Sequence, residues 1–156
     1  MVKSVVGKSK RLVDVKRLDF RENRKMKSVL ITGGAGYIGS ELAGFLLDAG
    51  YSVTIVDNLM YDATSLLRYT SNERFKFIKG DVRDLNLLTR QLAVSDIVIP
   101  LAALVGFPLC ERDPRGAEEI NHEHVANLAK LKMPQQKIIY PCTNSGYGSS
   151  EDICTE

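Results

Sequence analysis

Cysteine and long apolar runs are both scarce in this sequence, and their scarcity excludes several classes of protein. The 156 residues contain three cysteines, Cys110, Cys142 and Cys154, with no Cys-x-x-Cys pair. An odd number at this spacing fits neither a disulfide framework nor a zinc knuckle. No apolar run approaches the roughly 20 residues of a membrane-spanning helix, and the first residues lack the apolar core of a secretory signal. We therefore expect a soluble protein of the reducing cytoplasm, with no membrane partner.

Proline and glycine are too few for a fibrous or disordered chain. The sequence has 5 prolines and 12 glycines, with 44% hydrophobic and 26% charged residues. These proportions are ordinary for a globular protein and disfavour disorder, collagen and coiled coil. At this length they predict one compact domain with a buried core.

Positive charge is concentrated at the start of the chain. Residues 1–27 hold ten lysines and arginines but three acidic residues, a net charge of +7, whereas the remainder carries −5. This change predicts a basic N-terminal extension, residues 1–26, ahead of a domain that spans residues 27–156. A dense positive charge suits nucleic-acid binding. The extension has no aromatic interleaving beyond Phe20, so we favour a solvated segment over a nucleic-acid-binding arm.

Short apolar runs alternate with amphipathic stretches from Ser28 onward, which is typical of β-α-β units around a parallel sheet. The predicted strands are 28–32, 52–57, 75–79, 96–101 and 137–141. The predicted helices are 38–49, 85–92 and 114–132, with a short one at 65–69. Right-handed crossovers then give the strand order 3-2-1-4-5, a Rossmann-like, doubly wound α/β fold that is incomplete at its C-terminal side.

The first helix is predicted from apolar residues at helical spacing, namely Ile38, Leu42, Phe45, Leu46 and Ala49. This spacing is typical of an amphipathic helix. Gly50 is placed to end the helix.

A glycine-rich segment joins the first predicted strand to this helix and reads Thr32-Gly33-Gly34-Ala35-Gly36-Tyr37-Ile38-Gly39. A strand before it and a helix after it are the context in which such a pattern predicts a dinucleotide site. Glycines permit a tight turn, close approach of a pyrophosphate and close packing of helix on strand. The helix N-terminus at Tyr37 and Ile38 offers unpaired N–H groups to a phosphate.

Asp57 ends the second predicted strand, 24 residues after Gly33. This is close to the spacing of about 20 residues expected for the carboxylate that hydrogen-bonds an adenosine ribose. A carboxylate there repels a 2′-phosphate, and no lysine or arginine lies between Gly33 and Leu47 to neutralise one. The sequence therefore favours NAD over NADP.

Further segments follow the glycine loop in a familiar order: Asp57-Asn58, Gly80-Asp81-Val82-Arg83-Asp84, Leu101-Ala102-Ala103, Asn121 and Tyr140-Pro141-Cys142-Thr143-Asn144-Ser145-Gly146-Tyr147-Gly148. Together they resemble the N-terminal half of the extended short-chain dehydrogenase/reductases, the NAD-dependent epimerase/dehydratases of nucleotide sugars. The likeness covers residues 28–156.

The resemblance implies roles for individual residues. It places Asp81 and Val82 against the adenine, and it makes Thr143 the catalytic residue that hydrogen-bonds the sugar hydroxyl being oxidised. It also implies NAD as cofactor, a nucleotide sugar as substrate and a homodimer as assembly. The residues implied to bind the cofactor are Gly33, Gly36, Tyr37, Ile38, Gly39, Asp57, Asn58, Asp81, Val82, Leu101, Ala102 and Ala103.

In this family NAD⁺ takes a hydride from the sugar while the tyrosine of a Tyr-x-x-x-Lys motif removes the hydroxyl proton. The lysine lowers the pKa of that tyrosine. None of the six tyrosines here is followed by lysine four residues on, and the chain stops short of where the family places the motif. We therefore expect a partial enzyme that binds NAD without turning over a sugar. A natural, non-catalytic NAD-sensing module is the alternative.

Departures from the family pattern narrow the chemistry. Asn144 and Ser145 stand where the 4,6-dehydratases carry an acid, so epimerisation or simple oxidation and reduction is favoured over dehydration. Pro100 precedes Leu101 and predicts that the fourth strand ends there.

The longest predicted helix, 114–132, carries two histidines and an asparagine as candidate functional residues. His122 and His124 are two residues apart, so they point to different faces, and no metal site is expected. Asn121 either ties this helix to the loop after the fourth strand or faces solvent.

Overall fold

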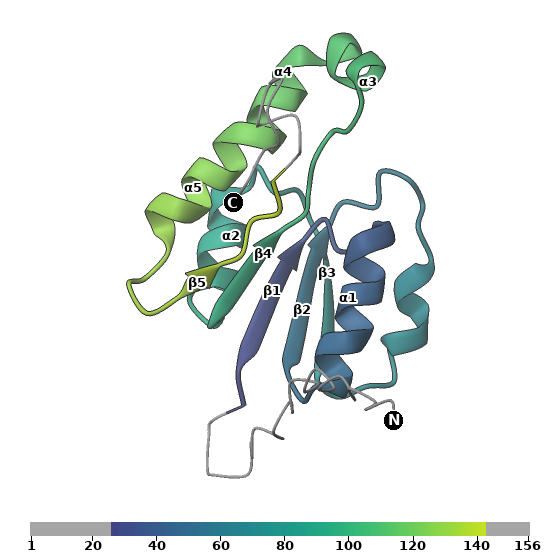
Figure 1. Ribbon diagram of the computed structural model, residues 1–156, viewed down its shortest axis with the longest axis vertical. Helices are drawn as coiled ribbons and strands as arrows, with labels where there is room; N and C mark the ends of the chain where they lie inside the picture. Colours follow the sequence, from purple (N-terminus) through teal and green to yellow (C-terminus); the bar gives the residue numbers. More distant parts are fainter. Residues whose placement is uncertain (1–25, 143–156) are drawn as a thin grey trace, which may run out of the picture.

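The computed structural model describes residues 26–142, and Figure 1 shows them as a parallel sheet between two layers of helices. The strands are β1 (Ser28–Thr32), β2 (Ser52–Asp57), β3 (Phe75–Lys79), β4 (Ile97–Pro100) and β5 (Lys137–Ile138). Their order is β3-β2-β1-β4-β5, and every neighbouring pair is parallel. The predicted α/β class and strand order are therefore confirmed.

The helices divide between the two faces of the sheet. One face is covered by α1 (Tyr37–Asp48) and the 3-10 helix η1 (Ser65–Tyr69), and the other by α2 (Leu85–Leu92) and α5 (His124–Leu131). Between β4 and α5 the chain forms α3 (Phe107–Arg112), α4 (Pro114–Ala117) and a π-helical segment, η2 (Glu118–Glu123). Figure 1 shows α1 and α5 on opposite sides of the strands.

The central strand β1 is buried on both faces, which explains its unbroken apolar sequence. Val29 and Ile31 pack in the cluster that includes Leu47 of α1, whereas Leu30 between them packs with Leu88 of α2. All of these side chains are at most 2% exposed. The alternation along β1 therefore joins two hydrophobic cores through one strand.

The predicted first helix and its end before Gly50 are confirmed, but the apolar residues that predicted it do not all face the sheet. Ile38 is 65% and Phe45 72% exposed, while Gly39, Ser40 and Ala43 are buried with Leu47. The helix starts so close to the sheet that only small side chains fit beneath its first turns. Leu42 and Leu46 flank that contact and are partly buried.

The region between β4 and β5 also differs from the prediction. The expected single helix over 114–132 is divided into α4, η2 and α5, because hydrogen bonding widens to a π-helical pattern over Glu118–Glu123. The six-residue α3 was not predicted, since it is too short to show a periodic stripe. β5 ends at Ile138 rather than at 141, and β4 ends at Pro100 as its proline predicted.

Two substitutions in α1 test which face of the helix is buried. Leu47→Ala removes a side chain that is 2% exposed and leaves a cavity, so we expect the free energy of unfolding to fall by about 2–5 kcal/mol. Phe45→Ala changes an exposed position, and we expect a change of less than about 0.5 kcal/mol. Urea denaturation followed by circular dichroism measures both. A larger loss for Phe45→Ala than for Leu47→Ala would contradict the packing described.

Candidate functional site

A cavity of about 870 Å³ opens at the carboxyl ends of the strands, between the loops that follow β1, β2, β3 and β4. This is the edge of the sheet where the strand order reverses, the usual ligand site of an open α/β fold. Its lining includes all the residues expected from sequence to bind a cofactor. Thr143, the expected catalytic residue, lies outside the described residues.

The glycine loop needs three of its glycines for the fold alone. A Cβ placed on Gly34 would lie 2.8 Å from Cγ2 of the buried Ile55. Gly33 has φ of +70°, and a Cβ placed there would lie 2.4 Å from the Cα of Ala102. A Cβ on Gly39 would lie 2.5 Å from the Cα of Gly34. These contacts bring the end of β1 against the loop after β4 and seat the start of α1 on the glycine loop.

Gly36 has neither of these reasons to be glycine. Its φ is −69°, which any residue adopts, and a Cβ there meets only the Gly33 carbonyl oxygen, at an ordinary 3.5 Å. It lies at the N-terminus of α1, lines the cavity and carries no side-chain cap. Its bare Cα leaves the first N–H groups of the helix open to an anionic ligand. The loop therefore fits the pyrophosphate of a dinucleotide.

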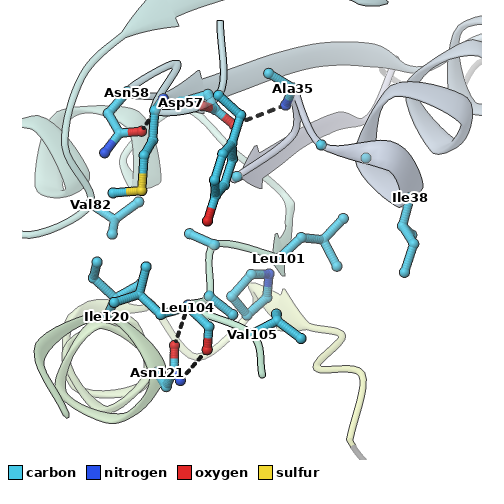
Figure 2. Close-up of a pocket in the computed structure, with 18 of the residues that line it drawn as sticks. Ala35, Ile38, Asp57, Asn58, Val82, Leu101, Leu104, Val105, Ile120 and Asn121 are labelled. Carbon is cyan, nitrogen blue, oxygen red and sulfur yellow. Dashed lines mark hydrogen bonds between the residues drawn. The ribbon is translucent and has the colours of Figure 1, made fainter. Parts of the chain in front are cut away.

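Asp57 lies at the end of β2 with both carboxylate oxygens engaged. Oδ2 accepts a hydrogen bond from the Ala35 N–H at 2.9 Å, and Oδ1 accepts one from the Leu59 N–H at 2.8 Å. Figure 2 shows the bond to Ala35 across the top of the cavity. The carboxylate thus anchors the glycine loop to β2 and adds a fixed negative charge to the cavity wall, a structural role that sequence reasoning missed.

Asp81 and Val82 form the wall that follows β3. The Asp81 carboxylate is paired with the guanidinium of Arg83, whose Nη2 is 2.6 Å from Oδ2. Hydrogen bonds from Arg83 hold the pKa of Asp81 below its usual range, so this carboxyl group is ionised. Val82 is 6% exposed and packs with Leu104 and Ile120.

Asn121 ties η2 to the loop after β4. Its Oδ1 accepts a hydrogen bond from the Leu104 N–H at 2.8 Å, and its Nδ2 donates one to the Leu104 carbonyl at 2.9 Å. Both bonds are visible in Figure 2. Of the two alternatives that the sequence left open for Asn121, the tie to the strand-four loop is confirmed. This clamp fixes the wall that contains Leu101, Ala102 and Ala103.

Sequence reasoning missed much of the apolar lining. The additional residues come from the loops after β2 and β4 and from the long helical region; they are Leu59, Met60, Tyr61, Leu104, Val105, Ile120 and Val125. A usable signal was the cluster of large apolar residues directly after the strand that ends at Asp57. Leu59 reaches the cavity through a left-handed backbone, with φ of 58°, which no sequence pattern indicated.

The two histidines occupy different environments. His122 is exposed, with Nδ1 2.7 Å from a carboxylate oxygen of Glu118. His124 is 1% exposed, and neither ring nitrogen has a hydrogen-bond partner of ordinary geometry among the described residues. Burial lowers the pKa of His124 to about 4, and the nearby backbone of Ile120 and the charge of Asp81 offset this only in part.

Neither a metal site nor a membrane-spanning helix is found within residues 26–142. Within residues 26–142, no group of three histidine, cysteine or acidic side chains is arranged to hold a metal ion. The helices of the same range are all too short or too polar to span a bilayer.

Comparison with known proteins places these features in a family. The model of the NAD dependent epimerase/dehydratase family matches residues 29–156. The chain is 35% identical over 130 residues to CDP-paratose 2-epimerase of Salmonella typhi, covering 79% of this chain and 38% of that protein. The chain thus spans about two fifths of the length of this relative.

Solved structures show the same architecture. The UDP-N-acetylglucosamine 4-epimerase of Methanobrevibacter ruminantium M1, in complex with UDP-N-acetylmuramic acid, has a TM-score of 0.74 and 30% identity, covering 85% of this chain and 43% of that one. The UDP-glucose 4-epimerase of Brucella ovis, in complex with NAD, has a TM-score of 0.67 and 25% identity, covering 81% of this chain and 39% of that one.

The buried His124 predicts a loss of stability in mild acid. Its pKa is about 4 in the folded chain against 6.5 for an ordinary histidine, so the unfolded chain binds the proton more readily. Its contribution is fully present above pH 6.5 and is lost as the pH falls toward 4, by up to about 3 kcal/mol. Urea denaturation across this range measures the effect.

A matched pair of variants tests whether His124 causes this decline in stability. We expect His124→Met to flatten the decline in unfolding free energy between pH 6.5 and 4, because the buried titrating group is gone. His122→Gln alters an exposed ring and should retain the decline of the parent. Equal slopes for the parent and His124→Met would assign the decline to other groups.

Proposed function

The chain belongs to the NAD dependent epimerase/dehydratase family, and from this premise we propose that residues 27–156 form the NAD-binding part of a nucleotide-sugar epimerase or a related oxidoreductase. In such an enzyme NAD⁺ accepts a hydride from a carbon of the sugar. The relatives described above support a nucleotide sugar as substrate, since their names specify CDP- and UDP-linked sugars. The cytoplasmic location and the homodimer stay predictions.

Gly36 is the observation that carries this proposal. Packing and backbone conformation both permit a larger residue at this position, yet a side chain there would fill the space in front of the first N–H groups of α1. A pyrophosphate in that space receives hydrogen bonds from the backbone and the positive end of the helix dipole. The glycine is therefore explained by a ligand and not by the fold.

The remaining walls are assigned to the other parts of the dinucleotide. We assign the adenosine ribose to Asp57 with Asn58, and the adenine to Asp81 with Val82. The second ribose is assigned to the wall of Leu101, Ala102 and Ala103. All of these residues line the same cavity as Gly36. Thr143 is assigned to the sugar hydroxyl.

No tyrosine in the sequence is followed by lysine four residues on. We therefore propose that residues 1–156 by themselves bind NAD without reducing it. A non-catalytic NAD-sensing module is the second candidate. Incubation with NAD⁺ and UDP-sugars, followed by NADH absorbance, tests for hydride transfer, and formation of NADH would reject both versions of this proposal.

Calorimetric titration with NAD⁺ tests the cofactor assignment through Gly36. We expect Gly36→Ala to keep the unfolding free energy within about 1 kcal/mol of the parent, because its Cβ meets no close atom. NAD⁺ affinity should fall at least about tenfold, since the methyl group displaces the pyrophosphate. Gly39→Ala is the contrasting variant, which should destabilise the fold itself. A Gly36→Ala protein that binds NAD⁺ like the parent would reject this assignment.

A second titration tests the preference for NAD⁺ over NADP⁺. Asp57→Asn removes the fixed charge that repels a 2′-phosphate. We expect the ratio of NADP⁺ to NAD⁺ dissociation constants to fall by about tenfold or more, which corresponds to about 1.4 kcal/mol. Asp62→Asn removes an exposed carboxylate five residues away and should leave the ratio unchanged. An unchanged ratio in Asp57→Asn would show that this carboxylate does not select the cofactor.

A further inference from the structure

Arg83 lies directly behind the cavity wall that contains Asp81. Its guanidinium donates a hydrogen bond to each oxygen of the Asp81 carboxylate, with Nε 2.9 Å from Oδ1 and Nη2 2.6 Å from Oδ2. The backbone N–H of Arg83 also donates to Oδ1, at 2.9 Å. Asp81 lines the cavity and Arg83 does not. Arg83 is therefore placed to act on a ligand only through Asp81.

The hydrogen bonds leave one part of the carboxylate available. An ionised carboxylate accepts about four hydrogen bonds, two on each oxygen. Among residues 26–142, Oδ1 receives two hydrogen bonds, both from Arg83, whereas Oδ2 receives one. Because the group is ionised, it can accept a hydrogen bond from a ligand but cannot donate one. The free acceptor position on Oδ2 therefore suits an amino group.

Arg83 is itself held from the other side. Its Nη1 donates to Oε2 of Glu119 at 3.1 Å, and Oε1 of Glu119 accepts from Nε of Arg115 at 2.8 Å. Glu119 belongs to η2, the π-helical segment whose Asn121 clamps the adjoining wall at Leu104. One segment thus braces both walls of the cavity.

The exposure of this network argues for a geometric role. The side chains of Arg83 and Asp81 are 45% and 34% exposed, and exposed ion pairs contribute little to the stability of a fold. A planar guanidinium that binds both oxygens does, however, fix the plane of the carboxylate. Its main effect is on where the free acceptor position of Oδ2 points.

We propose that Arg83 is a positioning residue that directs Oδ2 of Asp81 toward the 6-amino group of adenine, and so makes the cavity select adenine over 6-oxopurine dinucleotides. The inference rests on the proposed function and adds to it the basis of base selection. An adenine presents an N–H donor to the carboxylate. A hypoxanthine presents a carbonyl oxygen at the same place, which leaves two acceptors facing each other.

Titration of the full chain with NAD⁺ and with nicotinamide hypoxanthine dinucleotide tests the proposal. The two ligands differ at position 6 and at N1 of the purine, which is a bare acceptor in adenine and carries a hydrogen in hypoxanthine. The change in the ratio of their dissociation constants when Arg83 is substituted therefore reports the part of the preference that depends on Arg83. We expect the parent to prefer NAD⁺ by about tenfold or more, and Arg83→Met to reduce that preference to less than about threefold. Arg83→Lys keeps the charge but cannot bind both oxygens at once. Its preference for NAD⁺ should lie between those of the parent and of Arg83→Met.

Arg90→Met is the matched control, because Arg90 is an exposed arginine of α2 that does not line the cavity. It should keep the ratio of the parent. If Arg83→Met and Arg83→Lys weaken both ligands equally and leave the ratio unchanged, Arg83 has only a structural role and the proposal fails. A parent that binds both dinucleotides equally also overturns it. A folded parent that binds neither rejects the proposed function, and the inference with it.

Discussion

The close approach of the glycine loop to the loop after β4 is the constraint on which the site depends. A Cβ at Gly33 would lie 2.4 Å from the Cα of Ala102. No other residue therefore fits there unless the glycine loop or the loop after β4 moves. This contact lies where the strand order reverses, between β1 and β4. It sets the width of the cavity floor, and the loops after β2 and β3 build the remaining walls on that floor.

Polar interactions then hold the loops that the sheet does not reach. Asp57 ties the glycine loop to β2, and Asn121 ties the loop after β4 to η2. Both side chains form hydrogen bonds with backbone groups of the loops. These bonds therefore do not depend on which side chains the loops carry. These hydrogen bonds hold the backbone of two loops that line the cavity.

Strands and the glycine loop could be predicted because their signals are local. Val29, Leu30 and Ile31 are apolar in succession because both faces of β1 are buried, and a run of this kind predicts a buried strand without further context. The face of α1 could not be predicted in the same way. Ile38 and Phe45 are apolar but exposed, and the inward positions carry glycine, serine and alanine because the helix approaches the sheet closely. A hydrophobic pattern cannot reveal contact distances.

By itself the sequence determined the parallel α/β class, the strand order, the dinucleotide loop and the family. These follow from residue types at short spacings and from the strong preference for right-handed crossovers. Only the tertiary structure decided that Gly36 is free of packing demands, that Asp57 binds the glycine loop, and that Arg83 and Glu119 link Asp81 to η2. The reason is physical: each of these depends on distances between atoms of segments far apart in the chain, which arise when the sheet brings the strand ends together.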